Sequence, residues 1–212
     1  MSIEAFAPYS HPADIALLSA TPMLMAPRFG SLPPLLPGHS RHIAASDGLY
    51  LEARSNVMHI TCRLSTVQLP YGKATPAVRL IGGPIPAHIL QSAEDEAKAA
   101  MPNEWAGLIL YRHGRYELWT PSSASATPSR VSYLTGGVDP LDIVLDLHSH
   151  GAGPAFFSRT DDADDAAIQT PCVATGVIGQ CHLARPGHIL RYVVGGRFVA
   201  TSWNPFTATL AA

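Results

Sequence analysis

The chain has 212 residues, with 14 Lys and Arg against 16 Asp and Glu, so its formal net charge is −2. This length fits one buried domain with an appendage or two small domains. Near-neutral, scattered charge gives no reason to expect a nucleic-acid partner or an acidic membrane surface. The most apolar early stretch, residues 15–25, contains Pro22 and lacks the basic start of a secretory signal, and no run reaches membrane-spanning length.

Cysteine usage points to a reducing compartment. Cys62, Cys172 and Cys181 are odd in number and show no C-x-x-C spacing. This pattern is typical of free thiols rather than of a disulfide framework or a cysteine metal site. We therefore expect a cytoplasmic protein.

The N-terminal part is rich in proline. Pro33, Pro34 and Pro37 cluster among leucines, so regular helix or a central strand is not expected within the first 45 residues, which would pack as an arm. Residues 49–54 and 57–64 look like two strands of a hairpin, followed by a connecting loop at residues 70–76. Residues 1–78 are thus expected to form a Pro-rich, partly β N-terminal region.

The remainder, residues 79–212, alternates between strand and helix patterns. Ile89, Ala93 and Ala97 recur at helical spacing after Pro86, which predicts a helix over residues 86–100. Hairpins are expected around His113-Gly114 and Gly195-Gly196. The other expected elements are strands at 105–111, 115–119, 130–134, 143–150, 173–180, 189–194 and 197–202, a helix at 161–169 and a loop at 121–129. The sum is an α+β domain with a mixed β-sheet flanked by helices.

One motif carries chemistry: the uninterrupted pattern H-x-H-x7-S-x-x-D from His148 to Asp161. On a strand, His148 and His150 point to one face, and Asp161 returns from a helix start eleven positions after His150. Three protein ligands leave the fourth position of a tetrahedral zinc site for water, whose pKa then falls from about 15.7 to about 7. The motif predicts one Zn²⁺ per chain.

A general base and an oxyanion donor complete the expected machinery. Glu104 opens an apolar strand, where it would take the proton of the water and deliver it to a leaving amine. Ser158 would donate a hydrogen bond to the oxyanion of the tetrahedral intermediate. Glu117 is the rival base, but it lies within a strand and lacks the glycine that follows Glu104 three residues later, Gly107.

Each motif residue also has a purely structural explanation. Ser158 and Asp161 match a helix capping box, and the acidic run that follows suits a solvated first turn matched to the helix dipole; this run is Asp162, Asp164 and Asp165. Asp146 is either a partner that orients an imidazole or a solvent-facing carboxylate. His182 and His188 lack ligand spacing and are expected on the surface. The conjunction of two histidines, a serine and an aspartate favours the metal site.

These residues resemble the prokaryotic JAB/MPN (JAMM) metalloprotease family. The likeness lies in His148 to Asp161 with Glu104-x-x-Gly107 upstream, and it extends over about residues 80–200. It implies a cytidine deaminase-like fold in which His148, His150 and Asp161 bind zinc, Glu104 holds the nucleophilic water and Ser158 serves the oxyanion. Many members have proline directly after the second histidine, where this chain has Gly151. The glycine is expected to loosen the loop between His150 and Ser158.

The resemblance also implies a reaction and its partners. A zinc metallopeptidase or isopeptidase of this type would cleave an amide bond at or near the tail of a ubiquitin-like or sulfur-carrier protein. The layout with a Pro-rich N-terminal region is similar to JAB-type proteins of PRTRC plasmid-associated systems, which implies an activating-enzyme-like neighbour. The alternative is a non-catalytic MPN-type scaffold, although such scaffolds usually lose ligands. The zinc deaminase signature, H-x-E with a later P-C-x-x-C, is not present.

Overall fold

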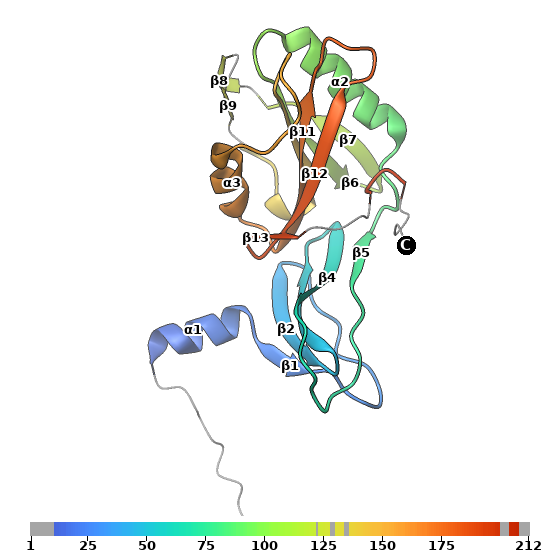
Figure 1. Ribbon diagram of the computed structural model, residues 1–212, viewed down its shortest axis with the longest axis vertical. Helices are drawn as coiled ribbons and strands as arrows, with labels where there is room; N and C mark the ends of the chain where they lie inside the picture. The colour runs from blue at the N-terminus through green and yellow to red at the C-terminus, as the bar shows by residue number, and fades with distance from the viewer. Residues whose placement is uncertain (1–10, 122, 128–129, 134–135, 200–203, 208–212) are drawn as a thin grey trace, which may run out of the picture.

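Two β-sheets, one above the other in Figure 1, form the body of the molecule. The computed structural model describes residues 11–121, 123–127, 130–133, 136–199 and 204–207. The N-terminal sheet has strand order β1-β2-β3-β4-β5, and the second sheet has order β13-β12-β11-β10-β6-β7. Within these residues, no helix is long and apolar enough to cross a membrane.

The N-terminal region is a sheet, not only an arm with a hairpin. Helix α1 and strand β2, which lies inside the sheet, both fall within the first 45 residues, where neither was expected. Pro12 is tolerated in the first turn of α1 because its missing N–H is not needed there. The prolines from 33 to 37 all lie in the irregular segment between β1 and β2. The elements are α1 (Pro12–Ala20), β1 (Met23–Met25), β2 (His39–Ala45), β3 (Gly48–Arg54), β4 (Met58–Ser65) and β5 (Ala77–Leu80).

The two faces of this sheet bury different partners. Side chains alternate along each strand, so Leu51 and Ala53 of β3 enter the large core that is shared with the second sheet. Tyr50 on the opposite face of β3 packs with Ala26 and Ile43 under the segment that precedes β2. The expected hairpin of β3 and β4 is confirmed, and it contributes buried side chains to both faces of the sheet.

The second sheet is mixed, as predicted. Strand β10 pairs with β11 in parallel and with β6 antiparallel, and the remaining pairs are antiparallel. Helices flank the sheet, so the predicted α+β class is confirmed. The elements are β6 (Ala106–Arg112), β7 (Arg115–Trp119), β10 (Ile143–Ser149), β11 (Cys172–Gly179), β12 (Gly187–Val194), β13 (Arg197–Val199), α2 (Ala87–Ala100), α3 (Arg159–Ala166) and a 3-10 turn at Pro140–Asp142.

Helices α2 and α3 lie on opposite sides of this sheet (Figure 1). Helix α2 buries Ile89, Ala93 and Ala97, as their spacing predicts, in the same core as Leu145 and Leu147 of β10. Because β10 alternates, its other side chains face the side that α3 covers. The face on the α3 side of the sheet is therefore the one on which side chains of β10 can take part in chemistry.

One expected loop is a strand. Residues Ser123–Thr127 form β8, which pairs antiparallel with β9 (Arg130–Tyr133) in a two-stranded ribbon. Serine and alanine have low strand propensity, so β8 depends on its partner strand rather than on its own sequence. Helix α3 begins at Arg159 and ends at Ala166, earlier at both ends than predicted. The predicted residues 134 and 200–202 lie outside the described residues.

The two sheets are joined by polar contacts as well as by the shared core. The side-chain amide of Asn56, in the β3–β4 turn, donates to Asp142 Oδ1 at 2.8 Å. The Cys172 thiol of β11 donates to the carbonyl of Met58 in β4 at 3.6 Å. The N-terminal sheet is therefore part of the structure that supports β11.

A charged network lies on the outer face of the N-terminal sheet. Arg41 Nε donates to Glu52 Oε2 at 2.6 Å, and His59 Nε2 lies 2.7 Å from Glu52 Oε1. The side chains of Arg41 and Glu52 are only 7% and 8% exposed. Burial alone would raise the pKa of Glu52, but hydrogen bonds from His59 and Arg41 hold it below its ordinary value. The carboxylate is thus ionised and paired inside the structure.

Replacing Arg41 with Met should destabilise the protein by about 3 kcal/mol, because loss of one partner leaves a buried carboxylate short of positive charge. Urea unfolding at pH 7 measures the change in the free energy of unfolding.

Arg63→Met is the matched control. Arg63 lies on the same face of the sheet and pairs with Asp47, but the two side chains are 46% and 44% exposed. An exposed pair contributes at most about 1 kcal/mol. Equal losses in the two variants would contradict the structural importance of the Arg41–Glu52 pair.

Candidate metal centre

The end of β10 presents two imidazoles on one face. His148 lies within β10, between β6 and β11, and His150 follows directly after its last residue. The His150 N–H donates to the carbonyl of Ile178 at 2.9 Å, which continues the ladder with β11 past the end of the strand. Both rings therefore project from backbone that is fixed by hydrogen bonds. They lie on one face, as the H-x-H spacing predicts.

The ligand atoms of His148, His150 and Asp161 lie within 4.8 Å of one another. The two Nε2 atoms are 3.3 Å apart, Asp161 Oδ1 is 3.4 Å from His148 Nε2, and Asp161 Oδ2 is 3.8 Å from His150 Nε2. Tetrahedral zinc with bonds of about 2.0 to 2.2 Å separates its ligands by about 3.3 to 3.6 Å. The three residues therefore fit a zinc ion with little movement.

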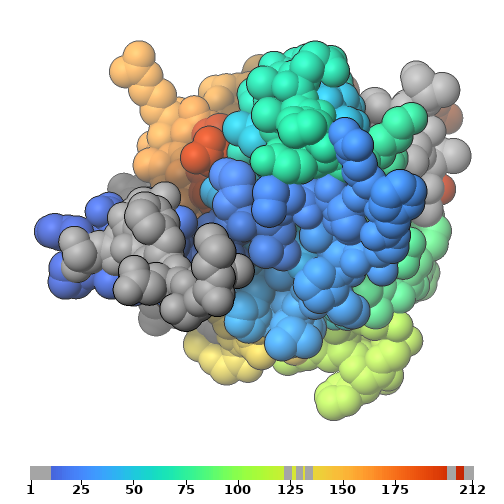
Figure 2. Space-filling model, turned by 90° about the horizontal axis from the view of Figure 1, so that it is seen from below, coloured from blue at the N-terminus to red at the C-terminus, as the bar shows by residue number. Residues whose placement is uncertain are grey.

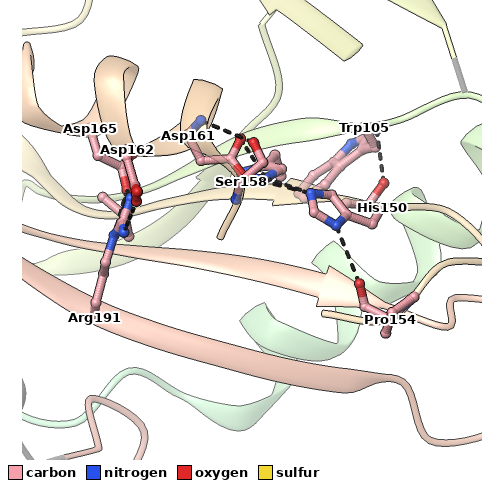
Figure 3. A network of polar contacts seen from close by, with 11 residues as sticks. Trp105, His150, Pro154, Ser158, Asp161, Asp162, Asp165 and Arg191 are labelled. Carbon is pink, nitrogen blue, oxygen red and sulfur yellow. Dashed lines mark hydrogen bonds and ion pairs between the residues drawn. The ribbon is translucent and has the colours of Figure 1, made fainter. Parts of the chain in front are cut away.

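The orientation of His150 is set by its second nitrogen. Its Nδ1 lies 3.2 Å from the carbonyl oxygen of Pro154, which accepts only if Nδ1 carries the proton (Figure 3). That tautomer leaves the lone pair of Nε2 free for a metal. The ring of Phe156 packs edge-on against the imidazole, with centroids 4.6 Å apart. His150 is thus held in the ligating form from two sides.

Ser158 and Asp161 form a reciprocal capping box at the start of α3. The Asp161 N–H donates to Ser158 Oγ at 3.2 Å, and the Ser158 N–H donates to Asp161 Oδ2 at 2.6 Å (Figure 3). The structural explanation of this pair is therefore correct, but it does not compete with the metal explanation. The cap itself turns the carboxylate of Asp161 towards His148.

The loop between the second histidine and the serine is anchored rather than loose. Gly151 has φ of +53°, a conformation that proline cannot adopt. Its carbonyl accepts from the Cys181 N–H at 2.8 Å, and the Gly153 carbonyl accepts from the Gln180 N–H at 2.6 Å. A Cβ on Gly179 would lie 2.1 Å from the Ala155 nitrogen, so this glycine lets the loop lie against β11.

Glu104 is positioned by contacts of its neighbours. The Trp105 N–H donates to Ser149 Oγ at 2.9 Å, and the Ser149 N–H donates to the Trp105 carbonyl at 2.8 Å. The Glu104 N–H donates to the Thr127 carbonyl of β8 at 2.8 Å. These bonds hold Glu104 beside the end of β10, where its carboxyl group interacts electrostatically with His148 and Asp161.

The titratable groups influence one another. Burial would raise the pKa of Asp161, but His148 and the Ser158 N–H hold it well below its ordinary range. Burial would lower the pKa of His148, and the Asp161 carboxylate outweighs this and raises it. Burial, together with the charge of His148, lowers the pKa of His150, which favours its neutral form. Burial raises the pKa of Glu104, with His148 opposing and Asp161 adding to the rise.

An arginine that sequence reasoning missed fixes helix α3. Arg191 of β12 donates from Nε and Nη2 to Asp165 Oδ2 at 2.9 and 2.6 Å, and it also pairs with Asp162 (Figure 3). Its guanidinium carbon lies 3.7 and 3.8 Å from the ring centroids of Phe157 and Phe198. The expectation of a solvated acid is therefore wrong for Asp165, whose side chain is 12% exposed, whereas Asp162 remains 47% exposed although it has the same partner.

The remaining candidates lie outside the cluster. Glu117 is paired with Arg112 across the β6–β7 hairpin, so it is not a competing base. His188 pairs with Glu94 of α2 at 2.9 Å, and His182 is exposed, as expected. Asp146 shares the face of His148 and raises the pKa of that imidazole. Of the two alternatives for Asp146, an electrostatic partner of the site is the one that the geometry favours.

Comparisons with known proteins give the family of the chain. A family described as prokaryotic homologs of the JAB domain matches residues 86–194, and a domain of unknown function, DUF2016, matches residues 11–81. No curated protein is significantly similar. The solution structure of protein DSY2949 from Desulfitobacterium hafniense is similar at 17% identity and a TM-score of 0.41, covering 54% of this chain and 86% of that one. The family match spans just over half of the chain, which therefore belongs to the prokaryotic homologs of the JAB domain.

Proposed function

We propose that the chain is a JAMM-type zinc metallohydrolase that cleaves an amide bond at or near the tail of a ubiquitin-like or sulfur-carrier protein. One observation carries the proposal: the ligand atoms of His148, His150 and Asp161 converge at the spacing of a tetrahedral site. Glu104 lies within electrostatic reach of the same cluster. A purely structural cluster would not need a base at this position.

Each residue has a defined part in amide hydrolysis. Zinc, when bound, supplies Lewis acidity and lowers the pKa of water to about 7. Glu104 has a raised pKa, which suits a group that takes the proton of the attacking water and passes it to the leaving amine. Ser158 Oγ accepts its capping bond from Asp161, so its own hydrogen remains available to donate to the oxyanion.

The substrate and setting belong to the proposal as well. A tail of a ubiquitin-like partner, in a PRTRC-type plasmid-associated setting with an activating-enzyme-like neighbour, follows from the family resemblance. Phe156 lies beside His150 and is 49% exposed, so it offers an apolar surface next to the reacting bond. The three cysteines are free and buried, which supports action in the cytoplasm.

Purified chain that is stripped of metal and then remetallated should hold about one zinc per chain. His148→Ala should lose it, because two ligands do not close the site. Inductively coupled plasma mass spectrometry of the dialysed protein measures the ratio. His188→Ala is the matched control, since His188 pairs with Glu94 outside the cluster. Zinc that persists in His148→Ala, or no zinc in the native chain, would exclude the site.

Glu104→Gln should remain folded and retain zinc, but it should lose hydrolysis of a tail-extended ubiquitin-like protein by about 10²- to 10⁴-fold. The amide has nearly the same shape as the carboxyl group and cannot take up the proton. Gel analysis of the cleaved tail, alongside zinc content, separates loss of chemistry from loss of the metal.

Glu117→Gln is the control for this experiment, because Glu117 lies in an ion pair on the neighbouring strand. Unchanged hydrolysis in Glu104→Gln would remove that residue from the chemistry. A native chain that holds zinc and binds the partner without cleaving it would support the alternative, a non-catalytic scaffold.

Arg191→Met should weaken zinc affinity about tenfold, because Arg191 holds the helix whose first turn carries Asp161. Competition with a chromogenic chelator measures the affinity. Arg112→Met is the control, since Arg112 also pairs with a carboxylate in the same sheet but contacts neither α3 nor the cluster. If both variants bind zinc as tightly as the native chain, Arg191 does not position the ligand.

A further inference from the structure

A pocket in the N-terminal sheet lies away from the metal cluster. It has a volume of about 390 Å³ and is formed between strands β2, β3 and β4 and the irregular segment that precedes β2. Figure 2 looks at the molecule from this end, where residues of the first third, in blue to green, spread over the face. The volume is in the range of small-molecule sites, about 300 to 1,000 Å³.

The walls of the pocket combine apolar and cationic groups. Leu32, Ile43 and the prolines of the covering segment give it apolar surface. Three cationic side chains line it, Arg41, Arg54 and Lys73, against one carboxylate, Glu52. Glu52 is already bound by Arg41 and His59. Its charge is therefore not available to balance Arg54 or Lys73.

Arg41 and Arg54 are held in the same way, except for one partner. Nη1 of Arg41 donates to the Pro33 carbonyl at 2.7 Å, and Nη1 of Arg54 donates to the Leu35 carbonyl at 2.8 Å. Nε of Arg41 also donates to a carboxylate, that of Glu52. Nε of Arg54 is buried and has no acceptor among the described residues. A buried donor without an acceptor costs about 1 to 3 kcal/mol.

We infer that this pocket binds a small organic anion whose carboxylate pairs with Arg54 and whose apolar body lies against Leu32 and Ile43. Since solvent does not reach Nε of Arg54, a carboxylate contacts it after a small shift of the covering segment, and it then repeats the arrangement that Glu52 makes with Arg41. The guanidinium edge that carries Nε is suited to two parallel bonds with a carboxylate. Lys73 is exposed and forms no ion pair with the part of the chain that the structure describes, so it adds attraction for the anion.

Titration of the full chain with benzoate tests this inference, with Arg Nε–H resonances recorded by nuclear magnetic resonance. Benzoate should shift the Arg54 Nε–H signal in a saturable manner. Benzamide has the same shape without the charge and should not shift it. Acetate has the charge without the apolar body and should bind more weakly than benzoate.

Variants separate the pocket from unspecific ion binding. Arg54→Met should weaken benzoate affinity about tenfold or more, and Lys73→Met, at an exposed position that should not affect folding, up to about fivefold. Arg63→Met leaves the pocket intact and should bind benzoate as the native chain does. The inference is overturned if benzoate leaves Arg54 unchanged, if benzamide acts equally, or if Arg63→Met weakens binding as much as Lys73→Met. Zinc content plays no part in these readouts, so failure of the metal site would not affect them.

Discussion

The reciprocal hydrogen bonds between Ser158 and Asp161 are the interaction on which the candidate site depends. They begin helix α3, and they also fix the carboxylate that faces His148. One oxygen of Asp161 closes the cap while the other lies 3.4 Å from His148 Nε2. The conformational entropy lost in fixing this ligand is thus offset by helix formation, which the fold needs in any case. Removing the cap would therefore affect the local fold and the ligand geometry together.

Local patterns predicted most of the site and much of the sheet. The alternation of a strand places His148 and His150 on one face, and the capping box was visible in the spacing from Ser158 to Asp161. The helical period of Ile89, Ala93 and Ala97 predicted α2 almost to the residue. These features depend on residues a few positions apart, which is the range over which sequence periodicity carries information.

Features that depend on distant partners were not predicted. Arg191 is 26 positions from Asp165, and nothing in the acidic run of α3 shows that a strand arginine neutralises it. Strand β8 forms because β9 pairs with it, and β2 lies inside a sheet although its preceding segment is rich in proline. The expected looseness at Gly151 was wrong for the same reason, because the hydrogen bonds that fix the loop come from Gln180 and Cys181, directly after β11. In each case the deciding contact joins separate segments.

Because side chains alternate along a strand, the residues of the core and those of the candidate sites lie on opposite faces of both sheets. In β10, Leu145 and Leu147 enter the core while Asp146 and His148 face α3. In β3, Leu51 and Ala53 enter that same core while Glu52 and Arg54 line the pocket. Because the two sheets share this core, inward substitutions in either sheet affect the stability of both. Outward substitutions act mainly on the site of their own face, except at buried pairs such as Arg41–Glu52, which also contribute to stability. The metal centre and the N-terminal pocket are therefore supported by one core but are open to independent change.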